Sequence, residues 1–198
     1  MELGDEIFYR LSREDTIVEV GGAWDRFAVA NDGQNLLSDR ILGQSIYAHV
    51  LGEPTRDFVW TMLDGVRKLK RPVRQTYRCD SPGLKRFMQM TIEPEGASGL
   101  CLRHRLVSTA PLVLPVQFRA VAPGTARAHL TFRGSCCNRL NVDGAWHDPE
   151  QASFTPELKQ LIDQGVMRIA YSVCPSCKSG ANWQPLDSET RIATTQYR

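Results

Sequence analysis

The chain has 198 residues, of which 42% are hydrophobic and 23% are charged, and this is the composition of an ordinary soluble globular protein. Its net charge of +2 comes from scattered basic residues, which argues against a nucleic-acid partner. The acidic N-terminus lacks the apolar segment of a signal peptide, and no apolar run is long enough to span a bilayer. We therefore expect a cytoplasmic protein that has no membrane partner.

The first part of the chain predicts short strands followed by helices. A weak strand pattern lies between residues 5 and 12, and the β-branched residues 16–20 predict a strand that ends at Gly21-Gly22. Helical spacing begins at Trp24, and residues 41–47 suit one or two helical turns. Residues 54–70 predict the longest helix, because their apolar side chains form one stripe and Pro72 follows.

Three strand-like segments come next, at residues 73–79, 85–92 and 99–107. Short turns of Asp, Ser, Pro, Gly and Glu join them, so neighbouring strands are expected to pair in antiparallel fashion. We therefore predict an α+β fold, in which helices pack on one face of this antiparallel sheet.

The second part of the chain differs in composition. Residues 108–128 are rich in Pro, Ala and small residues and predict a linker. We therefore divide the chain into a first domain at 1–107, the linker, a cysteine-rich module at 129–185 and a flexible tail at 186–198. The module contains four of the six cysteines and a predicted helix at 157–164.

A family resemblance rests on three segments of the first domain. They read VEVGGAWDRFA, ILGQSIYAHVLGEPTRDFVWTMLDGVRKLKRPV and YRCDSPGLKRFMQMTIEP. Together they resemble PAS-type sensor domains, and more specifically a bacterial subgroup of small PAS-like proteins with an Arg-Cys-Asp-Ser-Pro turn. The chain departs from the family at Gly21-Gly22, where an Asn usually precedes the first helix. The resemblance implies a five-stranded antiparallel sheet curled around a pocket, with helices on one face, that senses a small ligand or cofactor such as haem.

Three residues are candidates for contact with a ligand in such a pocket. His49 lies near the helical segment that lines PAS pockets, and His104 is in phase with the apolar residues of its strand. Cys79 falls on another predicted strand. The alternative is that all three are ordinary core or edge residues. The same choice, between pocket lining and plain core, applies to a group of large side chains, namely Trp60, Met62, Met88 and Met90.

The cysteine module predicts a metal site. Cys174 and Cys177 form a CxxC pair, and in a reducing compartment such pairs hold metal more often than they form structural disulfides. The upstream stretch CCNRLNVDGAWHDPE resembles a C-terminal extension of some PAS and sensor-kinase proteins, in which two cysteine pairs bind zinc. Cys137 matches the second cysteine of the first pair. The first cysteine of that pair falls on Gly134, however, and Cys136 lies two positions later.

The resemblance therefore implies a zinc-ribbon-like site with Cys137, Cys174 and Cys177 as ligands of Zn²⁺. Cys136, His147 or a water molecule could supply the fourth ligand. The alternative without metal is four partly buried free thiols.

No catalytic motif is present, so we expect the chain not to be an enzyme. We interpret it as a stand-alone bacterial sensory or regulatory protein that binds a small ligand, carries structural zinc and signals through a protein partner or self-dimer. The alternative is a thiol-based redox sensor in which cysteine oxidation releases zinc and alters partner binding. Two further readings have less support: a zinc-ribbon nucleic-acid binder, which the charge balance opposes, and an open zinc enzyme with Glu150 as its base.

Overall fold

The computed structural model describes residues 5–81, 83–113, 117–121, 130–152, 156, 159, 165–179 and 183–185. The strands are β1 (Glu6–Leu11), β2 (Ile17–Gly22), β3 (Val73–Arg78), β4 (Leu84–Glu95), β5 (Gly99–Pro111), β6 (Gln117–Ala120), β7 (Thr131–Gly134), β8 (Leu140–Val142), β9 (Ala145–His147), β10 (Val166–Ser172) and β11 (Trp183–Pro185). The helices are α1 (Trp24–Val29), η1 (Gln34–Leu36), α2 (Ser38–Ile41), η2 (Ile46–His49), α3 (Glu53–Leu69), α4 (Pro149–Ala152) and α6 (Pro175–Lys178).

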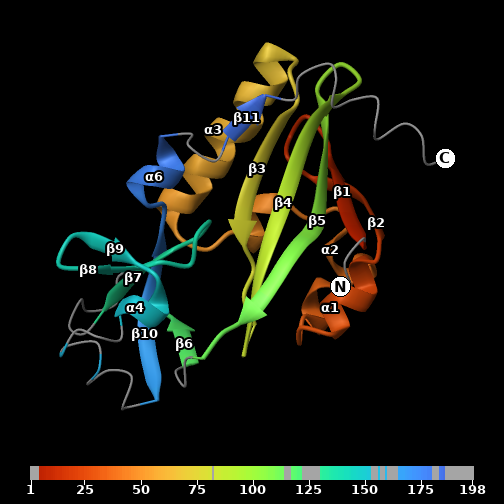
Figure 1. Cartoon of the computed structure of the whole chain (residues 1–198). Coiled ribbons are helices and arrows are strands. Elements are labelled where there is room, and N and C mark those ends of the chain that lie inside the picture. Colours follow the sequence, from red (N-terminus) through yellow and green to blue (C-terminus); the bar gives the residue numbers. More distant parts are fainter. Residues whose placement is uncertain are drawn as a thin grey trace.

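These strands form two sheets (Figure 1). The first sheet has the order β11-β3-β4-β5-β1-β2, and all of its pairs are antiparallel. The second sheet has the order β6-β10-β7-β8-β9, with β10 parallel to both of its neighbours. In the described part of the chain, no helix is long and apolar enough to cross a membrane.

The long helix forms as its sequence predicts. A glycine with a φ of 86° precedes α3, Pro54 occupies its first turn, and Lys70 ends it in a left-handed conformation. Its buried side chains include Met62, Leu63 and Val66, which belong to the core over the first sheet. The apolar stripe of the sequence is therefore the face that packs on the sheet.

The core of the first sheet lies between its inner face and the helices. Alternate residues of β4 and β5 are buried there, among them Ile92 and Leu102, together with Ile41 of α2 and Ile46 of η2. Five antiparallel strands and helices packed against them confirm the α+β prediction for β1 to β5. The sixth strand, β11, was not predicted, because three residues near the end of the chain carry too little pattern to indicate a strand.

The composition of residues 108–128 predicted a linker, and the described residues of this range differ from that prediction. Residues 108–111 continue β5 in register with the first residues of β4, and Gln117–Ala120 form β6 against β10. Backbone pairing, which composition does not report, decides these strands. The predicted helix at 157–164 lies, except for Lys159, outside the described residues, and so does the predicted tail at 186–198.

Candidate metal centre and a buried polar row

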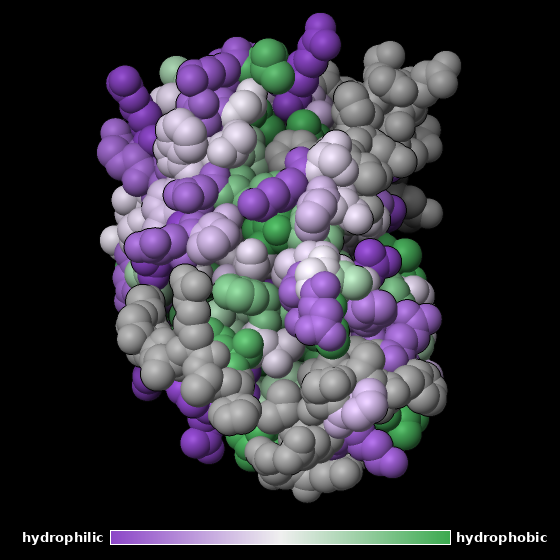
Figure 2. Space-filling view, turned by 90° about the vertical axis from the view of Figure 1, so that its left-hand side faces the viewer, coloured by the Kyte–Doolittle hydropathy of each residue, from purple (hydrophilic) through white to green (hydrophobic). Residues whose placement is uncertain are grey.

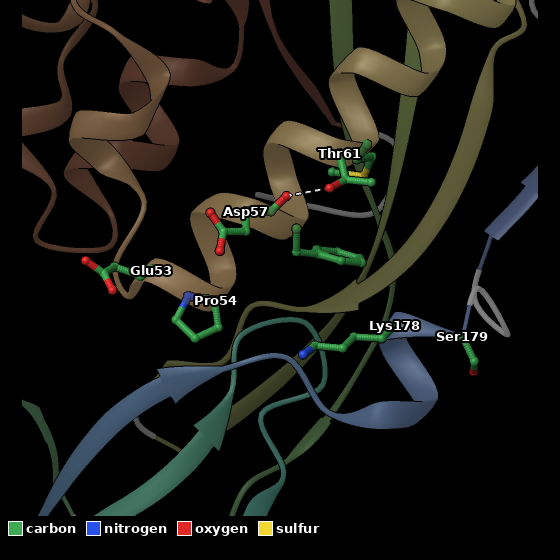
Figure 3. A pocket seen from close by; sticks show the side chains of 8 residues that line it. Glu53, Pro54, Asp57, Thr61, Lys178 and Ser179 are labelled. Carbon is green, nitrogen blue, oxygen red and sulfur yellow. Dashed lines mark hydrogen bonds between the residues drawn. The ribbon is translucent and has the colours of Figure 1, made fainter.

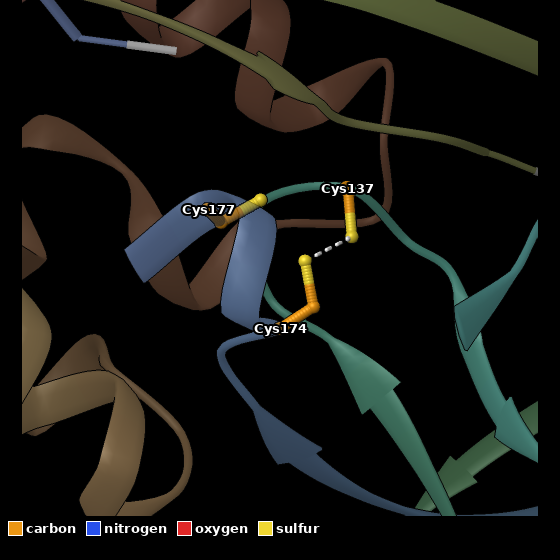
Figure 4. Close-up of side chains that lie close together, drawn as sticks. All are labelled: Cys137, Cys174 and Cys177. Carbon is orange, nitrogen blue, oxygen red and sulfur yellow. Dashed lines mark hydrogen bonds between the residues drawn. The ribbon is translucent and has the colours of Figure 1, made fainter. Parts of the chain in front are cut away.

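Three cysteine side chains meet beside α6. The Sγ atoms of Cys137, Cys174 and Cys177 all lie within 4.8 Å of one another, and those of Cys137 and Cys174 are 3.6 Å apart (Figure 4). In a tetrahedral zinc site with bonds of about 2.3 Å, sulfur ligands lie roughly 3.8 Å apart. Thiolates are also the donors that Zn²⁺ prefers in structural sites. The donor set and its spacing therefore fit one zinc ion.

The second sheet brings these cysteines together. β7 and β10 are parallel neighbours with Gly134 opposite Ser172, so the residues that follow both strands emerge at one end of the sheet. After β7 a tight turn, in which Asn138 donates its backbone N–H to the Gly134 carbonyl, places Cys137. After β10 the one-turn helix α6 carries Cys177 back over Cys174, whose carbonyl accepts its N–H at 3.0 Å.

Cys136 and His147 were the predicted candidates for a fourth ligand. Cys136 packs against the cluster and its thiol hydrogen-bonds with that of Cys177, yet Cys136 lies outside the group whose sulfurs are all within 4.8 Å of one another. His147, at the end of β9, also lies outside that group. The structure thus brings together three of the four predicted cysteines and places the fourth at their edge.

Gly134 occupies the position of the cysteine that the resemblance leads one to expect. A Cβ atom at this position would lie 2.6 Å from the Sγ of Cys137 and 3.5 Å from the ring of Trp146. A side chain at position 134 would therefore point into the cluster. A cysteine at this position would therefore clash with Cys137 in the present arrangement, and the cluster would have to shift to admit it.

The environment of the cluster disfavours free thiolates. A hydrogen bond with Cys177, together with burial, raises the pKa of Cys137, and a hydrogen bond with Cys136 is the largest cause that raises the pKa of Cys177 to about 12. Without metal these thiols are protonated at neutral pH. Zinc binding at this cluster would therefore release protons.

The cysteine turn is attached to the first sheet by contacts that sequence reasoning missed. The backbone N–H of Arg78 donates to the carbonyl of Cys136 at 2.8 Å, and its guanidinium contacts Asp80 and Asp148, each at 2.6 Å. From α3, the hydroxyl of Thr55 lies 2.5 Å from that of Ser135. The signal for the first attachment was present in the sequence, since Arg78 and Asp80 belong to the Arg-Cys-Asp-Ser-Pro turn.

A row of buried polar side chains crosses the inner face of the first sheet. Gln75, Met90 and His104 are direct neighbours on β3, β4 and β5, and all three are buried. Nδ1 of His104 lies 2.8 Å from the hydroxyl of Tyr77, and its ring stacks on Tyr9 with the centroids 5.4 Å apart. Among the described residues, His104 Nε2 and Gln75 Oε1 are buried without a hydrogen-bond partner.

The side chains of this row are all neutral at pH 7. Burial lowers the pKa of His104 to about 4 and raises the pKa values of Tyr9 and Tyr77. The imidazole and both phenols are therefore uncharged at neutral pH, and Gln75 carries no charge.

The other two predicted ligand contacts are His49 and Cys79. His49 ends η2 and has a buried Nε2 without a partner, whereas Cys79 follows β3 and has a thiol pKa that burial raises. Within the described chain, no hydrogen bond or ring contact joins His49, Cys79 and His104. Cys79 interacts electrostatically with Tyr77, the hydrogen-bond partner of His104, and contact of the three residues with a ligand stays a prediction.

The four large side chains that could line a pocket or the core differ in burial. Met62, Met88 and Met90 are buried, whereas Trp60 is 55% exposed on the outer face of α3. Trp60 therefore lines no interior pocket. Helical phase explains the difference, because Trp60 lies two residues before Met62 and so faces away from it.

Two surface grooves are lined in part by residues of the cysteine-rich module. The first has a volume of about 770 Å³ between α3 and α6, and its lining includes Asp57, Thr61 and Lys178 (Figure 3). The face that is turned to the viewer in Figure 2 is mostly hydrophilic, with small separate apolar areas. The second groove, of about 550 Å³, includes Glu150, whose carboxylate pairs with Lys85; this pairing lowers its pKa. A lowered pKa makes Glu150 a weak base.

Comparisons with known proteins leave the family open. No protein-family model matches the chain, and no curated protein matches it. Among solved structures, the chain is similar to a domain of an HTR-like protein from Haloarcula marismortui ATCC 43049. That similarity has a TM-score of 0.39 and 14% sequence identity, and it covers 52% of this chain and 98% of the other.

Proposed function

We propose that this chain is a sensory or regulatory binding protein with a structural zinc site at Cys137, Cys174 and Cys177, completed by Cys136. The observation that carries the proposal is the cluster of three sulfur atoms within 4.8 Å, formed by residues from two separate segments. A second sheet of short strands has a small apolar core, which contains the buried residues Leu140, Met167 and Ile169. Such a small unit gains much of its stability from a metal staple.

Native mass spectrometry of the freshly purified chain tests the zinc site. We expect an excess of one zinc per chain over the denatured mass, and the loss of that excess in Cys174→Ser. Cys101→Ser is the matched control, because Cys101 is a buried thiol of β5 outside the cluster. A wild-type chain that carries no zinc would refute the metal site.

The sensor function is proposed for the buried polar row. Two partnerless polar atoms, Nε2 of His104 and Oε1 of Gln75, lie on one face of the sheet. Buried polar groups normally have partners, so each of them calls for a bound water molecule or ligand. Since the row is neutral, a charged ligand would be buried without compensation. We therefore infer a small uncharged ligand with hydrogen-bonding groups at both ends.

The same mass spectra test this part of the proposal. A second mass excess that disappears in a His104→Phe, Gln75→Leu variant, while zinc is retained, would support a ligand in the polar row. A crystal structure with only ordered water beside His104 and Gln75 would contradict it.

A thiol-based redox sensor is the second candidate function, and the 3.6 Å between Cys137 Sγ and Cys174 Sγ favours it. Hydrogen peroxide, with two protons from solvent, would oxidise the two zinc-bound thiolates to a disulfide, giving two molecules of water and releasing the metal. Mild peroxide would then release zinc and leave the chain lighter by two hydrogens. If zinc stays bound under peroxide, the site is structural only.

A further inference from the structure

The outer edge of β3 pairs with two segments, and each of them lies close in sequence to a cysteine of the cluster. At one end, the carbonyl of Cys136 accepts the N–H of Arg78 at 2.8 Å. At the other end, β11 pairs with β3, with Gln184 opposite Arg74 (Figure 1). Cys136 directly precedes a cysteine of the cluster, and β11 begins a few residues after Cys177.

The alternation of the strand identifies the backbone groups that lie under this cover. The N–H of Arg78 points to the outer edge, whereas the N–H of Cys79 donates to the carbonyl of Arg86 in β4. Because successive N–H groups of a strand point to opposite sides, the N–H of Arg74 also faces the outer edge. The N–H groups of Gln75 and Tyr77 then face β4.

The residues of β11 agree with this alternation. Gln184 lies opposite Arg74, so the two residues present their N–H and C=O groups to each other. Pro185 lies opposite Val73, whose N–H faces β4, so the missing N–H of the proline costs no hydrogen bond to β3. A three-residue strand has little stability of its own. It therefore depends on the anchor that precedes it.

We propose that metal at the cysteine cluster controls whether the outer edge of β3 is covered, and this proposal rests on the proposed zinc site. With zinc bound, Cys137 and Cys177 are fixed to each other, and their neighbours hold Cys136 and β11 against β3. Without zinc both anchors loosen, and the edge presents its free N–H and C=O groups. An open strand edge accepts a further strand, which is the kind of contact that signalling through a protein partner requires.

The strand β3 links its covered outer edge to the buried polar row. The same strand carries Gln75 and Tyr77 on its inner face, where Tyr77 holds His104. The metal site and the buried polar row therefore share one strand. If the cover and the polar row bias the same arrangement of β3, metal and ligand affect each other reciprocally.

Amide hydrogen exchange of the full-length chain, followed by NMR, tests the proposal at single residues. Native mass spectrometry first establishes one zinc per chain, and a chelator with a reductant then removes it. We expect exchange at the Arg74 and Arg78 amides to become at least about tenfold faster without zinc. Gln75 and Tyr77 are internal controls in the same strand and should change by less than about twofold.

The other outcomes separate the cover from the zinc site. Unchanged exchange at Arg74 and Arg78 after proven zinc loss would overturn the cover while leaving the zinc site intact. Equal acceleration of all four amides would also overturn it, since the whole sheet would then have loosened. A chain that never binds zinc refutes the zinc site itself, and with it the control of the edge by metal.

A variant that leaves every cysteine unchanged tests the role of β11. Truncation of the chain after residue 182 removes β11 and with it the Gln184 carbonyl that faces the Arg74 N–H, and the zinc content should stay at one per chain. The Arg74 amide should then exchange rapidly even with zinc bound, while the Arg78 amide stays protected by Cys136. Continued protection of Arg74 in this variant would show that β11 is not its cover and would refute the proposal.

Discussion

The hydroxyl of Tyr77 lies 2.8 Å from Nδ1 of His104, on the inner face of the first sheet within a row of uncharged polar side chains. Burial lowers the pKa of His104 from 6.5 to about 4. The unfolded chain therefore binds a proton between about pH 6.5 and pH 4 that the folded chain does not bind.

This difference predicts acid destabilisation with a defined window. The stability that neutral His104 contributes is fully present above about pH 6.5 and is lost as the pH falls toward 4, up to roughly 3 kcal/mol. Urea unfolding at pH 7 and pH 4.5 measures it. His104→Gln keeps a hydrogen-bonding group that does not titrate, so its loss of stability between the two pH values should be smaller. An equal loss in both proteins would contradict the prediction.

Gly134→Ala is expected to weaken the metal site. Its Cβ would lie 2.6 Å from the sulfur of Cys137, so the cluster must shift. We expect a loss of about 1 to 3 kcal/mol in stability and at least tenfold weaker zinc retention against a competing chelator. Gly65→Ala in α3 is the control, because nothing lies within 4 Å of its added Cβ. That substitution should stabilise the chain by about 0.5 to 1 kcal/mol.

Arg78→Ala should weaken the attachment of the second sheet to the first, because it removes the guanidinium and leaves the backbone bond to Cys136. The side chain of Arg78 is 9% exposed, and it neutralises Asp80, whose side chain is 2% exposed, as well as Asp148. Removal of one member of a buried ion pair costs about 3 to 5 kcal/mol. Arg105→Ala, which alters an arginine that donates a surface hydrogen bond to Gln89, should cost no more than about 0.5 kcal/mol. Similar costs for the two variants in chemical denaturation would argue against the attachment.

Trp60→Ala and Met62→Ala compare the two faces of α3. Trp60 is 55% exposed, so its replacement should cost less than about 1 kcal/mol. Met62 is 4% exposed in the core, so its replacement should cost about 2 to 5 kcal/mol. Thermal unfolding of the two variants measures the difference. A larger effect at Trp60 would show that this side chain is covered in solution, for example by a second copy of the chain.

The regular elements of the first domain were predictable because their signals are local. The stripe of α3, Pro54 at its start and the alternation along β4 and β5 follow from neighbouring residues alone. β11 and β6 were not predictable in this way. Each is a short strand whose partners lie far away in the sequence, so its stability comes from the edge that it meets.

The residues of the candidate sites also differ in whether a local sequence signal indicates them. The CxxC spacing indicated Cys174 and Cys177, and the resemblance added Cys137. Both signals are spacings of cysteines within short segments, so they can be recognised without a structure. The sequence could not distinguish Cys136 from His147, since the position of a sulfur atom depends on the turn that carries it. Gln75 was missed altogether, because a polar residue on a strand gives no sign of which face is buried.

The sequence by itself determined strands β1 to β5, the long helix α3 and the gathering of cysteines near the C-terminal end. These features follow from side-chain type and spacing within short segments. Only the tertiary structure decided that Arg78 holds the cysteine turn, that Gly134 borders the sulfur of Cys137, and that β11 covers the edge of β3. These are contacts between distant segments, and they exist only when the packing of two sheets has paid the entropy of bringing those segments together.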